Sequence, residues 1–79
     1  MKSFQCVMES EKKFLLVRTK AKNIDDAREK FSGLAFAIST SLEDFRIIDE
    51  IIEIRESWEK IENGEIFPTN SKIIRVRDK

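Results

Sequence analysis

The feature that most constrains the fold is an alternation of apolar and polar residues near the N-terminus. Over residues 4–8 and again over 15–21, every second residue is uncharged and mostly apolar, and the polar stretch 10–13 separates the two runs. A period of two is that of a β-strand, whose side chains point alternately to opposite faces. Two such runs joined by a short polar turn predict a β-hairpin.

The alternation also predicts how the two strands pair. Placing Glu9 opposite Phe14 gathers one set of residues on a single face, which is the expected core: Phe4, Cys6, Met8, Leu15, Val17 and Thr19. The other face carries Val7 beside Leu16 near the turn and Arg18 further away. We therefore expect one core face and one face that is part apolar and part basic.

A helix of about 15 residues is predicted next, beginning at Ile24. Asn23 is a favourable N-cap, and Asp25 and Asp26 lie in the first turn, where the helix dipole favours anions. Gly33 in the helix interior costs up to ~1 kcal/mol relative to Ala unless it permits a close backbone approach. Apolar residues recur along one side of this helix: Ile24, Ala27, Phe31, Leu34, Ala35 and Ile38.

Residues 42–62 support two interpretations, of which a second helix is favoured. On a helix, three carboxylates fall opposite an apolar side formed by Ile47, Ile51, Ile54, Trp58 and Ile61. The concentration of Ile instead favours a strand over 45–54, followed by a hairpin over 58–67 that turns at Asn63-Gly64.

Residues 72–77 predict a short strand that closes the sheet antiparallel to a hairpin strand. We expect one α+β domain over residues 1–79, with an antiparallel sheet of three or more strands and one or two helices on one face. The predicted order is ββααβ, or ββαβββ if the middle segment forms strands. Because so small a core supplies only a few kcal/mol, burial against a partner would add stability.

Composition argues against catalysis and bound cofactors. With no His and one Cys the chain cannot supply the four ligands of a usual zinc site, and glycines only at positions 33 and 64 cannot form a phosphate-binding loop. Cys6 lies on the expected core face, where a thiol serves as a packing residue. We expect a protein that is not an enzyme and that binds no metal or cofactor.

The sequence carries no signal for a membrane. No apolar run approaches the roughly 20 residues that span a bilayer, and the N-terminus lacks the pattern of a signal peptide. We therefore expect a cytoplasmic protein.

A net charge of zero hides an uneven distribution of charge. Residues 43–65 hold 3 basic and 9 acidic residues, a net charge of −6, whereas residues 1–30 and 66–79 each have a net charge of +3. The acidic stretch would be attracted to a basic surface such as a nucleic-acid channel. Its cluster of Asp49, Glu50 and Glu53 is a candidate partner contact, with a solvated acidic face as the plainer interpretation.

The outer face of the hairpin is the second candidate contact. Helices can cover only one side of a three-stranded sheet, which leaves Val7, Phe14 and Leu16 available to a protein partner or to a second copy in a homodimer. Cations on the second and last strands would merge into one patch if those strands pair. Direct nucleic-acid binding is therefore an alternative, although no aromatic residues interleave with these cations as base stacking requires.

The order of hairpin, Asn-capped helix, acidic Ile-rich segment and C-terminal strand resembles, in outline, small accessory proteins of phages and mobile elements, some of which are anti-CRISPR inhibitors. The resemblance covers most of the chain and rests on no motif, so it assigns no site residue. It implies a non-enzymatic protein that occupies a surface of a host nucleoprotein or defence complex.

Overall fold

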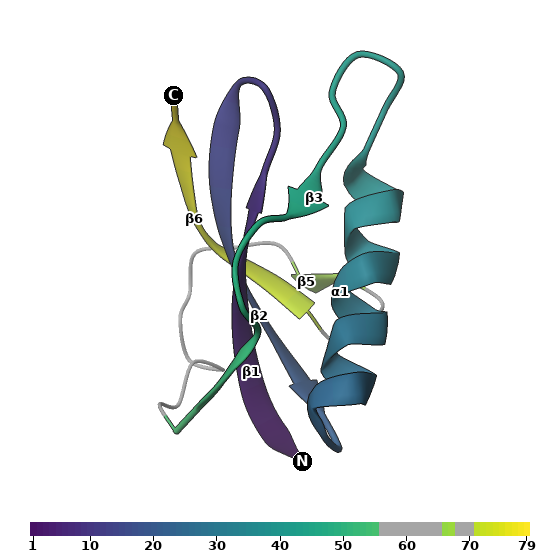
Figure 1. Ribbon diagram of the computed structural model, residues 1–79, viewed down its shortest axis with the longest axis vertical. Coiled ribbons are helices and arrows are strands. Elements are labelled where there is room, and N and C mark those ends of the chain that lie inside the picture. The colour runs from purple at the N-terminus through teal and green to yellow at the C-terminus, as the bar shows by residue number, and fades with distance from the viewer. Residues whose placement is uncertain (56–65, 68–70) are drawn as a thin grey trace.

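The computed structural model (Figure 1) describes residues 1–55, 66–67 and 71–79. In these residues six strands form one antiparallel sheet and a single helix packs on it. Five strands run in the order β3-β1-β2-β6-β5, and β4 also pairs with β1. The α+β class is confirmed. The elements are β1 (Lys2–Glu9), β2 (Lys13–Ala21), α1 (Ile24–Ile38), β3 (Arg46–Ile47), β4 (Ile52–Ile54), β5 (Ile66–Phe67) and β6 (Ser71–Asp78).

The predicted hairpin register is confirmed along its whole length. Glu9 pairs with Phe14, and the pairing continues to Lys2 opposite Ala21. The turn is held by Ser10, whose backbone N–H donates to the Lys13 carbonyl at 2.9 Å and whose hydroxyl accepts from the Lys13 N–H at 3.1 Å. All residues of the expected core face are at most 3% exposed: Phe4, Cys6, Met8, Leu15, Val17 and Thr19.

The predicted helix is also confirmed, and two hydrogen bonds fix its first turn. The Asn23 side chain accepts from the Asp26 N–H, and the Asp26 carboxylate accepts from the Lys22 N–H, each at 2.9 Å. The hydrogen bond from Lys22, aided by the charge of Lys30, lowers the pKa of Asp26 from its ordinary value. The side of α1 that faces the sheet buries Ala27, Phe31, Leu34 and Ala35.

The second helix predicted for residues 42–62 is wrong over the part that the structure describes, up to residue 55. Residues here extend along the free edge of β1, where β3 pairs Ile47 with Met8 and β4 pairs Ile52 with Gln5. The edge of β1 offers unpaired backbone groups, and β-branched Ile suits a strand that pairs with them. Two short strands therefore replace both the helix and the single strand over 45–54.

The predicted ββααβ order is accordingly wrong, because the described residues contain one helix and place four strands after it. The alternative order, ββαβββ, is nearer to the structure but has three strands after the helix where the described residues have four. Trp58 and the predicted turn at Asn63-Gly64 lie outside the described residues.

The C-terminal strand, β6, pairs antiparallel with β2, as predicted. The pairing contains a bulge that the sequence does not predict. The register shifts between Leu16 and Val17, so that Arg75 lies opposite Leu16 and Ile73 lies opposite Val17. This bulge keeps Ile73 packed against the core and places Arg75 on the opposite face. At the far end of the pairing, the Ser71 hydroxyl donates to the buried Thr19 hydroxyl at 2.9 Å.

The helix covers one face of the sheet, and the core lies between the two layers (Figure 1). Phe45, just before β3, and Ile51, just before β4, close the core at 8% and 7% exposure. In the part of the chain that the structure describes, no helix lies on the opposite face of β1, β2 and β6.

Candidate functional site

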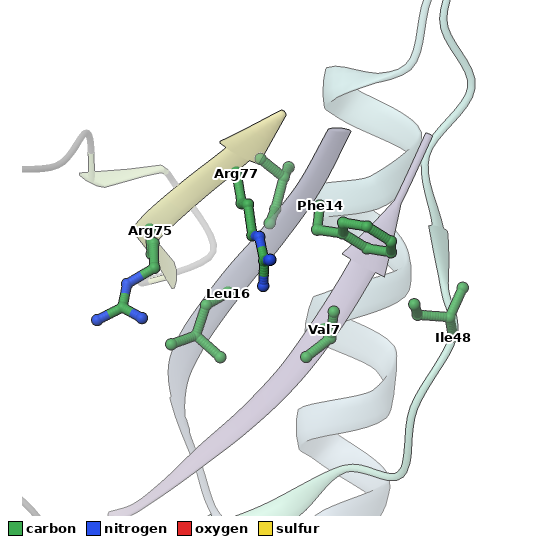
Figure 2. A pocket seen from close by; sticks show the side chains of 7 residues that line it. Val7, Phe14, Leu16, Ile48, Arg75 and Arg77 are labelled. Carbon is green, nitrogen blue, oxygen red and sulfur yellow. The ribbon is translucent and has the colours of Figure 1, made fainter. Parts of the chain in front are cut away.

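The face of the sheet opposite to α1 carries a shallow apolar depression of about 340 Å³. Val7 and Leu16 are directly paired across the hairpin. The Ile48 N–H donates to the Val7 carbonyl at 3.0 Å, which holds Ile48 against the edge of β1. We call the residues that line this depression on the face opposite to α1 the outer patch (Figure 2): Val7, Phe14, Leu16, Ile48, Arg75 and Arg77.

Three of the predicted partner-binding residues therefore lie together. Val7, Phe14 and Leu16 are half-buried by one another and their neighbours, whereas adjacent Leu15 is 3% exposed on the core face. Ile48 is 43% exposed and was not among the predicted contact residues, because on a helix it would have lain on the apolar side with Ile47.

The arginines of β6 stand on the same side of the sheet as these apolar residues. Arg75 pairs with Leu16 and Arg77 pairs with Phe14, and both arginines are exposed. Figure 2 shows the Arg77 side chain extending toward Leu16 and Val7, whereas the Arg75 guanidinium lies further out, beyond Leu16. Within the described residues neither arginine forms an ion pair.

Other charged groups of this face are engaged with neighbours inside the protein. The Lys79 ammonium lies 3.0 Å from the Glu9 carboxylate and 5.0 Å from the centroid of the Phe14 ring. The Arg18 Nε donates to the Gln5 side chain at 2.9 Å. In the register of β2 and β6, Arg18 lies opposite Lys72, which is buried at 4% exposure.

The acidic residues of the predicted partner surface are placed elsewhere. Asp49 and Glu50 line a second depression beside the first turns of α1, with Ile24 and Arg28. Glu53 lies in β4, with its carboxylate 3.6 Å from the Lys2 ammonium. The three carboxylates follow the β3–β4 edge of the sheet and do not join the outer patch, because the helix that would have aligned them is not formed over residues 42–55.

The structure also shows where the single thiol lies. Cys6 is 2% exposed between the hairpin and the helix, and burial raises the pKa of its thiol to about 12. Its place in the core cluster agrees with the prediction that Cys6 is buried on the core face. Among the described residues, no three His, Cys, Asp or Glu side chains are grouped so as to hold a metal ion.

Two further observations bear on classification. The helix of the described residues is too short and too polar to cross a membrane. Comparison with protein-family models, with curated proteins and with solved structures found no match to this chain.

Proposed function

We propose that this chain is a non-enzymatic protein-binding module that acts by covering a surface of a host protein or nucleoprotein complex. The observation that carries the proposal is the outer patch, an apolar cluster on the face of the sheet opposite to the helix. A mode of action by surface masking is the one implied by the resemblance to small phage and mobile-element inhibitors of the anti-CRISPR type.

The energetics of the outer patch favour association with a partner. Fully burying a side chain such as Val7, Leu16 or Ile48 contributes about 1.5–3 kcal/mol, of which only the part still exposed to water is available to an interface. A domain of 79 residues has a small core of its own, so this remaining gain is large relative to its total stability.

The proposal is tested by affinity purification from the native host with three proteins: the wild type, Leu16→Asp and Phe36→Asp. Phe36 is 86% exposed on α1, so its substitution introduces the same charge at an apolar position away from the patch. We expect the wild type and Phe36→Asp to retain the same partner and Leu16→Asp to lose it. Retention of that partner by folded Leu16→Asp would overturn the proposal.

The carboxylates of Asp49, Glu50 and Glu53 form an acidic edge of the sheet along β3 and β4. This acidic edge suggests another contact for the same function, in which the edge is attracted to a basic channel of the partner. Reversing Asp49, Glu50 and Glu53 to Lys should then abolish partner binding and leave the circular dichroism spectrum unchanged. Unchanged affinity in a pull-down would remove the acidic edge from the interface and leave the outer patch as the contact.

Direct nucleic-acid binding is a second candidate, favoured by the pairing that sets Arg77 beside Phe14. It predicts a gel shift at low salt that weakens as salt is added and is lost in the Arg75→Ala/Arg77→Ala variant. A homodimer joined through the outer patch is the third candidate. It predicts a dimer by light scattering for the wild type and a monomer for Leu16→Asp.

A further inference from the structure

We infer that the outer patch recognises an acidic protein segment in which large apolar side chains lie next to carboxylates. Arg75 and Arg77 would bind the carboxylates, and the depression between Val7, Leu16 and Ile48 would take the apolar side chains. This inference rests on the proposed protein-binding function and names the chemistry of the partner.

The local charge of this face differs from that of the whole chain. Although the chain has a net charge of zero, the two arginines are exposed beside the depression. Glu9 is the carboxylate nearest to Phe14 along β1, and the Lys79 ammonium lies 3.0 Å from it. An approaching segment therefore meets a locally positive rim.

Three described carboxylates near the sheet are engaged with groups on other sides of the molecule. Glu43 accepts a hydrogen bond from the Ser10 hydroxyl at 2.9 Å and lies 3.6 Å from the Lys13 ammonium, at the hairpin turn. Glu53 lies beside Lys2, and Asp26 caps the helix. None of these groups lines the depression on the outer face, so none of them compensates its arginines.

Arginine is well suited to this recognition. Its planar guanidinium presents paired donors that match a carboxylate, and such charge-assisted hydrogen bonds are stronger than neutral ones. The apolar side chains of Leu16 and Phe14 stand opposite Arg75 and Arg77 in the register. A partner that covers these apolar groups also removes water from the arginines, which strengthens an ion pair that forms there.

The lining of the depression favours protein over nucleic acid as the occupant. Its floor is largely aliphatic, which suits apolar side chains better than bases, whose binding relies on stacking against aromatic rings. Phe14 is its one aromatic lining residue, and the Lys79 ammonium already lies over that ring. A single-stranded nucleic acid would find cations here but at most this one ring on which a base could stack.

The experiment is a selection of random displayed peptides against the folded full chain, with Leu16→Asp as the counter-selection target. We expect the enriched peptides to carry Asp or Glu next to Leu, Ile, Phe or Trp. Enrichment of basic or uncharged peptides, or no enrichment over the counter-selection, would overturn the inference.

One enriched peptide is then measured by fluorescence anisotropy beside its analogue with Gln and Asn in place of Glu and Asp. We expect about tenfold weaker binding for the analogue, and a similar loss when the Arg75→Gln/Arg77→Gln variant meets the original peptide. The matched control, Lys12→Gln/Lys22→Gln, removes the same charge from exposed positions outside the patch and should bind as the wild type does.

The outcomes separate this inference from the proposed function. If Leu16→Asp abolishes peptide binding but the arginine variant and the amide analogue do not, the protein-binding surface stands and its preference for acidic partners is wrong. If a labelled single-stranded oligonucleotide binds and peptides do not, both proposals fail.

Discussion

The two faces of the β1–β2–β6 sheet are built from the same strands and differ in what covers them. On the inner face, Met8 pairs with Leu15 and α1 covers both, leaving them 0% and 3% exposed. On the outer face, Val7 pairs with Leu16 and no helix of the described residues lies on them. Apolar side chains alone therefore do not decide which face of the sheet becomes the core.

The decision follows from the polar residues between the apolar ones. On the inner face, buried polar side chains form hydrogen bonds with each other, as the hydroxyls of Ser71 and Thr19 do. The outer face instead carries Arg18, Arg75 and Arg77, whose charges would lose their hydration beneath a helix. The helix therefore packs on the inner face, and the outer apolar cluster is left beside cations.

The largest test of this contrast uses two phenylalanines on opposite sides of α1. Phe31→Ala empties a fully buried position and should lower the free energy of unfolding by about 3–5 kcal/mol, or unfold the chain outright. Phe36→Ala, at a position that is 86% exposed, should change it by less than about 0.5 kcal/mol. Urea denaturation followed by circular dichroism gives both values, and similar losses would contradict the orientation of the helix.

The next test compares neighbouring leucines on the two faces of β2. Leu15→Ala should cost about 2–5 kcal/mol because the helix cannot fill the space, whereas Leu16→Ala should cost less than about 1.5 kcal/mol. The same denaturation experiment measures both free energies of unfolding. Similar slopes of free energy against urea concentration would show that the two variants expose similar amounts of surface when they unfold. A cost for Leu16→Ala equal to that for Leu15→Ala would mean that the outer face is packed as a second core.

A smaller effect is expected at the start of the helix that covers the inner face. Asn23→Ala removes the acceptor for the Asp26 N–H and should lower the free energy of unfolding by about 1 kcal/mol. Asn23→Asp keeps an acceptor and should stay within a few tenths of the wild type. Equal losses in the two variants would show that the cap does not hold the helix in place.

The smallest effect is expected at Gly33, which is exposed on α1. A Cβ at this position would meet nothing within 4 Å, so Gly33→Ala should raise the free energy of unfolding by about 0.5–1 kcal/mol. A thermal melt measures the gain. A loss of stability would contradict the open surroundings of this position.

The local parts of the fold are predictable from the sequence, and the parts set by distant contacts are not. Alternation and turn residues determine the hairpin register, and Asn23 with the apolar stripe determines the helix. Residues 46–54 have helical spacing and strand-forming residues at once, and the free edge of β1 decides between them. The sequence pattern of residues 46–54 does not show that this edge is available for pairing.

The same division holds for the candidate site. Val7, Phe14 and Leu16 follow from the hairpin alone and are predictable. Arg75 and Arg77 reach the patch through pairing with β2 and a bulge, and Ile48 reaches it through a hydrogen bond to Val7. These depend on how remote segments meet.

Both proposals require that the outer patch is accessible while the inner face is sealed, and methyl NMR with a soluble paramagnetic agent measures this difference. The methyl groups of Val7, Leu16 and Ile48 report the outer face, and those of Leu15 and Val17 report the inner face. We predict strong relaxation of the first set and little relaxation of the second. Equal protection of both sets would contradict both proposals.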